Sequence, residues 1–255
     1  MTKQNSLSTL IYFTCLILIA TGCAPLRPDT NPLLDKKAFD LSTRARSFNQ
    51  HIMAAKGTGF ARLETKTHVE KFKIAWAAVF PNKIRITFLL SGHPVETIIA
   101  TGEKVTFLSH TGKHAKYSYY SKDPDMKDYI HVPVKLSDMI SVLLGRLPVK
   151  KFDDAYFSPS DASLSTITLT RTWKSTTQYL HVNSRGKIAG LKMTDHEGTL
   201  LYDMTIIRYK PYDFNDIPVQ IKIKDKDNKV LTLTITSFLA NPPIKESVFR
   251  LTGSR

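Results

Sequence analysis

The sequence predicts a mainly β protein with some α: a half-open antiparallel β-barrel of about ten to eleven strands, with an N-terminal helix and one inserted helix that acts as a lid. Two observations predict this class. Short runs of alternating apolar and polar residues, separated by turn residues, occupy most of the chain. Beyond the N-terminus, apolar residues recur at helical spacings of three and four in only two segments.

The alternating runs are typical of strands that bury one face. The clearest pair is 217–224 and 231–236, which the turn sequence "DKDN" connects. The other runs are 72–80, 84–90, 95–101, 104–109, 116–120, 163–170, 177–183, 188–194 and 199–209, with a short last strand at 248–252. So many antiparallel strands in one domain require a sandwich or a curled sheet. The Cys…Trp…Cys core of an immunoglobulin-like sandwich is missing, which favours the curled sheet.

The first helical segment runs from about Leu34 to Ala55, and its apolar residues form one stripe. We expect it to end before Gly57 and Gly59.

The second helical segment lies within 132–151 and interrupts the strands. Ser137 stands at the N-cap position, and Gly145 and Pro148 stand where the helix should stop. Its apolar residues are Leu136, Met139, Ile140, Leu143 and Leu144. An apolar helix between two halves of a curled sheet can cover the open side of the sheet, and we therefore interpret it as a lid.

The N-terminus indicates export. The apolar run Leu10–Ala20 is too short to span a bilayer comfortably, and it leads into "IATGC", which ends at Cys23. This ending resembles the lipobox of bacterial lipoproteins, which implies cleavage after Gly22 and a lipid anchor such as palmitate on Cys23. An ordinary secretory signal and an uncleaved anchor are the alternatives. Ala24 rather than aspartate follows the cysteine, which favours the outer membrane of a Gram-negative bacterium.

We therefore divide the chain into a signal peptide (1–22), a lipidated proline-rich tether (23–32) and a single domain (33–255). The chain carries 36 lysines and arginines against 22 acidic residues, a net charge of +14. Behind an export signal this charge suits anionic lipid headgroups or an acidic protein partner rather than nucleic acid, and a solvated basic surface explains it equally well.

Signals for catalysis are weak. Cys15 lies in the signal peptide and Cys23 at the acylation site, so no thiol remains for a disulfide, a metal site or a nucleophile. His110 and His114 flank the turn sequence "TGK" and do not form a helical metal pair. The aspartates of "KDPDMKD" lack the glycine and closing glutamate of a calcium loop. We therefore predict no enzyme activity, no catalytic residue, no metal and no cofactor.

Three segments together resemble the LolA/LolB family of the lipoprotein-localisation pathway: "FNQHIMAAKGTGFARLET", "NKIRITFLLSGHPVETIIATGEKVTFLSHTGKHAKY" and "VPVKLSDMISVLLGRLP". The resemblance implies an incomplete antiparallel barrel whose hydrophobic interior is lidded by helices. It also implies a periplasm-facing receptor in the outer membrane. This chain departs from the pattern in the loop of Ser91–Val95, where Pro94 and Val95 would face the membrane but only Val95 is apolar.

The resemblance further implies a protein that binds acyl chains in a hydrophobic cavity and passes lipids or lipoproteins to the membrane. Its partners would be these acyl chains, a periplasmic LolA-like carrier and the membrane that holds its anchor; we expect a monomer that binds no nucleic acid. An envelope-stress sensor or a structural lipoprotein with the same fold is the alternative, and a filled core is the alternative to a cavity. The candidate cavity residues are Trp76, Ile86, Phe88, Leu90, Met139, Ile140, Leu143 and Leu144.

Overall fold

The computed structural model describes residues 31–127, 132–158, 161, 163, 165–172 and 176–251. The predicted signal peptide, the acylation site at Cys23 and nearly all of the tether lie outside these residues. Leu33–Arg255 forms one compact unit, to which the following description applies. Among the described residues, every helix is too short or too polar to cross a membrane.

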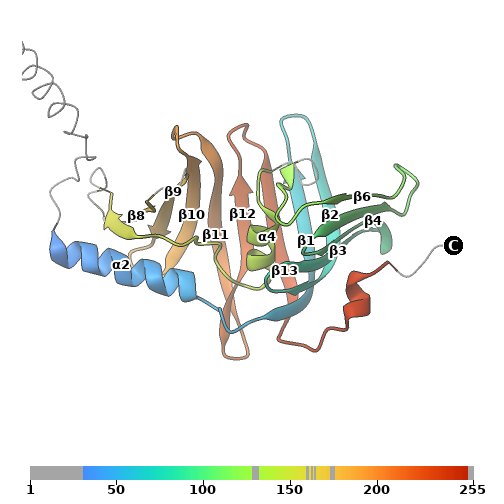
Figure 1. Cartoon of the computed structure of the whole chain (residues 1–255), viewed down its shortest axis with the longest axis horizontal. Coiled ribbons are helices and arrows are strands. Elements are labelled where there is room, and N and C mark those ends of the chain that lie inside the picture. The colour runs from blue at the N-terminus through green and yellow to red at the C-terminus, as the bar shows by residue number, and fades with distance from the viewer. Residues whose placement is uncertain are drawn as a thin grey trace, which may run out of the picture. The chain divides into compact units, whose positions relative to one another are not determined.

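A single sheet of thirteen strands forms the body of this unit, in the order β6-β5-β4-β3-β2-β1-β13-β12-β11-β10-β9-β8-β7 (Figure 1). All its pairs are antiparallel, and β1 joins the two ends of the chain by pairing with β13. The sheet is open, with β6 and β7 at its two edges. The strands are β1 (Ala54–Glu64), β2 (Val69–Val79), β3 (Lys83–Leu90), β4 (His93–Thr101), β5 (Lys104–Ser109), β6 (Tyr117–Tyr120), β7 (Asp154–Phe157), β8 (Thr166–Thr170), β9 (Thr176–Val182), β10 (Ile188–Asp195), β11 (Leu200–Tyr212), β12 (Asn215–Lys224) and β13 (Val230–Ala240).

The predicted fold class is therefore confirmed as mainly β, with an open antiparallel sheet, whereas the strand number of ten to eleven was too low. The alternation pattern missed β1 and β7, and the last predicted strand is instead a 3-10 helix, η1 (Glu246–Phe249). β1 lacks the alternating pattern because glycines occupy two of its inner positions. Glycine is required at both, because other groups approach the backbone closely there. A Cβ atom on Gly57 would lie 2.3 Å from the ring of Trp76, and one on Gly59 would lie 2.2 Å from the carbonyl oxygen of Thr234.

The first helix, α2 (Pro32–Ser47), is shorter than the predicted segment 34–55. Asn49 just beyond it has a positive φ of 55°, the left-handed conformation that commonly ends a helix. Ile52 then enters the core, and the chain continues as β1 from Ala54. Residues 48–55 have helical apolar spacing, but pairing of β1 with β2 and β13 outweighs this local preference.

The inserted helix is α4 (Leu136–Leu143). Ser137 is not its N-cap: the Asp123 carboxylate accepts hydrogen bonds from the backbone N–H of Ser137 at 2.8 Å and from its hydroxyl at 3.0 Å. The start of the helix is therefore capped by a residue from another loop. Gly145 has a φ of 71° and follows the last turn, as the sequence predicts.

Both helices pack against the same face of the sheet, which we call the inner face (Figure 1). On β10, Leu191 belongs to the apolar cluster under α2, and Met193, two residues further, belongs to the cluster under α4. The C-terminal segment covers part of the outer face, where Phe249 packs with Ala77 and Ile99.

The lid interpretation is wrong for α4 as the structure has it. Met139, Ile140, Leu143 and Leu144 are 0–3 % exposed and belong to the main hydrophobic cluster with Trp76 and Ile86. The indole N–H of Trp76 donates a hydrogen bond to the Leu143 carbonyl oxygen at 3.3 Å. The helix is apolar because it fills the interior of the curled sheet, and it is part of the core.

Candidate functional site

The inner face of the sheet is longer than α4, and this difference creates a cavity. Along β3, Ile84 and Ile86 are buried in the main cluster, whereas Phe88 and Leu90 on the same face line an open space. The same change occurs along β2 between Ile74, which is buried, and Phe72. None of the residues that line this space belongs to α2 or α4.

The cavity has a volume of about 530 Å³, within the usual range for small-molecule sites. Its apolar lining comes from six strands, and the rings of Phe72 and Phe88 meet edge to face with centroids 6.0 Å apart. The apolar residues are Ala61, Leu63, Phe72, Phe88, Leu90, Val95, Ile98, Phe107 and Leu231. The polar ones are Glu70, Glu96, Thr111, Lys113, His114 and Tyr117. Such a lining favours an apolar ligand with a polar end.

The loop between β5 and β6 supplies three of the six polar lining residues, Thr111, Lys113 and His114, and His114 fastens the loop to β4. Its Nδ1 lies 2.8 Å from the Ala115 carbonyl oxygen, and its Nε2 lies 3.0 Å from a carboxylate oxygen of Glu96. Both partners can only accept hydrogen bonds, so both contacts are satisfied only when the ring is protonated. The hydrogen bond to Ala115, assisted by Glu96, raises the pKa of His114, although partial desolvation and Lys113 oppose this shift.

We expect the β5–β6 loop to be held more tightly at acidic than at neutral or alkaline pH. Because the pKa of His114 is raised on folding, its stabilising effect is complete below the ordinary histidine pKa of about 6.5 and is lost as the pH rises through the folded value. An NMR titration of the His114 ring, with hydrogen exchange of the loop amides, measures this. Glu96→Gln should lower the His114 pKa; an unchanged value would show that the carboxylate does not act on the ring.

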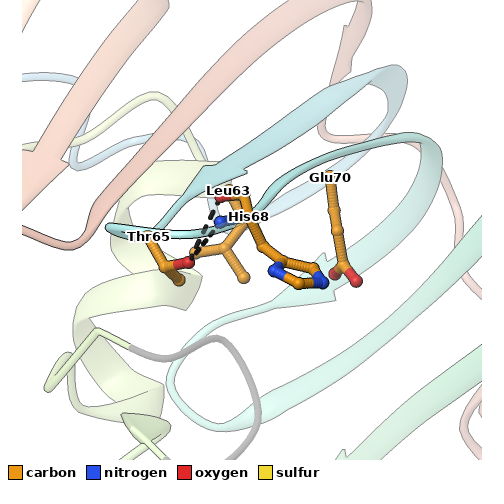
Figure 2. Close-up of a pocket in the computed structure, with 4 residues that line it drawn as sticks. All are labelled: Leu63, Thr65, His68 and Glu70. Carbon is orange, nitrogen blue, oxygen red and sulfur yellow. Dashed lines mark hydrogen bonds between the residues drawn. The ribbon is translucent and has the colours of Figure 1, made fainter.

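A smaller hollow of about 220 Å³ adjoins the cavity at the turn between β1 and β2 and is lined by Leu63, Thr65, His68 and Glu70 (Figure 2). Leu63 and Glu70 line both spaces. The turn is closed by hydrogen bonds from the Thr65 N–H to the His68 carbonyl oxygen at 2.8 Å and from the His68 N–H to the Thr65 hydroxyl at 3.0 Å. The hollow therefore shares part of its wall with the cavity.

The structure separates the predicted cavity residues into two groups. Phe88 and Leu90 line the cavity, together with Val95, which faces it rather than solvent alone. Pro94 is exposed on β4. The remaining predicted residues, Trp76, Ile86, Met139, Ile140, Leu143 and Leu144, lie in the buried cluster.

Sequence reasoning missed the rim. His114 was considered only as a metal ligand, with His110, but His110 bonds the Thr97 hydroxyl at 2.9 Å while His114 bonds Glu96. Among the residues that the structure describes, no group of three or more acidic, histidine or cysteine side chains is placed to hold a metal. The signal that could have found the rim is position: these residues follow or precede the ends of strands whose inner faces are apolar.

Comparison with known proteins agrees with the architecture. A DUF1329 family protein from Desulfovibrio piger superimposes with a TM-score of 0.60 at 8 % identity, covering 85 % of this chain and 97 % of the other. A LolA superfamily protein from Nitrosomonas europaea gives a TM-score of 0.55 at 12 % identity, covering 84 % of this chain and 97 % of the other. The fold is LolA-like.

A protein domain from Vibrio parahaemolyticus, named for outer membrane lipoprotein sorting, gives a TM-score of 0.50 at 14 % identity, with 84 % of this chain and 97 % of the other covered. No protein-family model and no curated protein matches the sequence. Identities this low establish the fold alone.

Proposed function

We propose that this chain is a lipid-anchored, periplasm-facing protein of the outer membrane that holds acyl chains of lipids or lipoproteins and passes them to the membrane. The observation that carries the proposal is the cavity, because its walls are apolar and its ionisable groups lie at its mouth. Each methylene moved from water into such a space contributes about 0.8 kcal/mol. The proposed activity is binding and release, without a chemical step, and a LolA-like carrier would be the donor.

In this proposal Phe88 and Leu90 contact the chain directly. The other predicted residues do not contact the chain. They form the buried core at the inner end of the cavity: Trp76, Ile86 and the α4 residues. The apolar residues of the sheet thus divide between a dry core and a ligand site. The cavity is open at one end in the structure as it stands, so release does not require α4 to leave the core.

Phe88→Glu is expected to reduce the affinity for a fluorescent fatty-acyl probe by on the order of tenfold or more, because it places a carboxylate against hydrocarbon. The stability should fall by only about 1–2 kcal/mol, since Phe88 is half-buried. Probe titration and denaturant unfolding measure the two effects. Leu89→Glu is the matched control: it places the same charge on the outer face, opposite Lys73, and should leave binding unchanged. Equal effects of both variants would place the ligand elsewhere.

The anchor is tested separately. Cys23→Ser is expected to abolish incorporation of a palmitate analogue and to release the protein from the membrane fraction, because the thiol of Cys23 is the proposed attachment point. The variant should retain the fold, since the sheet and its core lie within Leu33–Arg255. Labelling of the variant to the same extent as the unchanged protein would rule out this cysteine as the anchor.

A further inference from the structure

We infer that the cavity takes one acyl chain per protein molecule, inserted tail first with the polar head of the lipid at the mouth. This rests on the proposed function and specifies the ligand of the same site. Three features of the cavity carry it: its volume, its closed inner end, and the position of its polar groups.

The volume limits the number of methylene groups. A water molecule occupies about 30 Å³ of liquid, and a methylene group is of similar size. A cavity of about 530 Å³ therefore accommodates roughly 18 such groups. That is one long acyl chain. Two or three chains of this length would need about two or three times the volume.

The inner end of the cavity is closed. On β2 the lining residue Phe72 is followed on the same face by Ile74, which is 3 % exposed, and on β13 Leu231 is followed by Leu233, which is 4 % exposed. Ile74 and Leu233 belong to the cluster that contains α4. A chain that enters the cavity therefore meets close-packed core and cannot extend beneath the helix.

The polar groups give the ligand its direction. Glu70 and Lys113 are exposed, and the side chains of Glu96 and His114 are 26 % and 32 % exposed. The most buried lining residues are apolar: Ile98 and Phe107 are each only 2 % exposed. Burying a charged head among these would be costly, so the head stays at the rim.

The adjoining hollow at the β1–β2 turn does not provide room for a second chain. Three of its four lining residues, Thr65, His68 and Glu70, are polar, and its volume is about 220 Å³. Figure 2 shows the His68 and Glu70 side chains, both of which line this hollow. At this volume the hollow holds only about seven methylene groups, too few for a second long chain.

The test is a titration of the full-length protein with saturated fatty acids of increasing chain length, with native mass spectrometry to count bound molecules. We expect one molecule bound. Affinity should rise about fourfold for each added methylene and stop rising near a length of about 18 carbons. A lysophospholipid should bind at least as tightly as the diacyl lipid with the same chains.

A pair of variants tests whether the inner part of the cavity sets the chain length at which affinity stops rising. Ala61→Phe fills the inner part of the cavity, where Ala61 is 6 % exposed, and should move the plateau several carbons shorter. Thr232→Phe adds the same ring on the neighbouring strand, where Leu231 and Leu233 occupy the inner face, and should leave the plateau unchanged.

The outcomes distinguish this inference from the proposed function. Affinity that continues to rise beyond the plateau length, two or more chains bound at once, or an unmoved plateau in Ala61→Phe would overturn the single-chain inference and leave acyl binding standing. Affinity that does not depend on chain length at all would instead overturn the proposed function.

Discussion

Leu143→Glu is expected to unfold the domain. The Leu143 side chain is 1 % exposed within the main hydrophobic cluster, and its backbone carbonyl accepts the indole hydrogen bond of Trp76. The substitution removes an apolar side chain from a close-packed site and buries a carboxylate there, at a cost of about 4 kcal/mol or more. A domain is usually stable by only about 5–15 kcal/mol, so this is most or all of its margin. Chemical denaturation, followed by circular dichroism, measures the loss.

Two controls set the scale for this effect. Leu233→Glu, on the inner face of β13 and 4 % exposed, should be equally damaging. Leu90→Glu, at the cavity mouth and 55 % exposed, should lose little stability. A hinged lid would give a different pattern: Leu143→Glu would unfold cooperatively near the unchanged midpoint and lose only acyl binding. That result would restore the lid interpretation.

The alternation of apolar and polar residues predicted the sheet because it reports directly which side chains share a face. β12 and β13 follow the predicted pattern, with Ile221 opposite Leu233 and Ile223 opposite Leu231 on the inner face. The same pattern failed for β1, where Gly57 and Gly59 take the places of apolar residues. Those glycines are explained by Trp76 and Thr234, and the sequence does not show that these residues are neighbours.

The cavity was only partly predictable for a related reason. Periodicity assigns Ile86 and Phe88 to the same face of β3, but only the placement of α4 makes the first a core residue and the second a cavity residue. That placement is decided by contacts distant in sequence. Phe214 is a separate exception: its side chain is apolar, yet it is fully exposed at the β11–β12 turn.

The position of α4 is fixed at its C-terminal end by Arg146. This residue is only 7 % exposed, and its guanidinium stacks over the Phe80 ring at 4.6 Å. It donates to the carbonyl oxygens of Gln50 and Ile52, both at 2.7 Å, and of Asn49 at 3.2 Å. Backbone carbonyls thus replace the water that the cation loses, and burial lowers its pKa from the ordinary arginine value.

A second connection runs in the opposite direction. The Asn49 side-chain amide donates to the Gly145 carbonyl oxygen at 2.7 Å and to the Asp216 carbonyl oxygen at 2.9 Å. At the other end of α4, the buried Asp138 carboxylate pairs with Lys150 and accepts a hydrogen bond from the Tyr202 hydroxyl. Burial raises the pKa of Asp138, while Lys150 opposes the rise. These polar contacts hold both ends of α4 in place against the rest of the domain.

Arg146→Ala is accordingly expected to destabilise the domain by about 3 kcal/mol or more, because it leaves the carbonyls of 49–52 without their charged donor. The amides at the end of α4, including that of Gly145, should lose protection from hydrogen exchange, since the helix loses its connection to this segment. Arg146→Lys should give an intermediate loss, because an ammonium group lacks the planar fork that reaches several carbonyls. Arg62→Ala removes a surface arginine paired with Glu64 and should cost less than about 1 kcal/mol. If Arg146→Ala were as mild as Arg62→Ala, the position of α4 would depend on apolar packing alone.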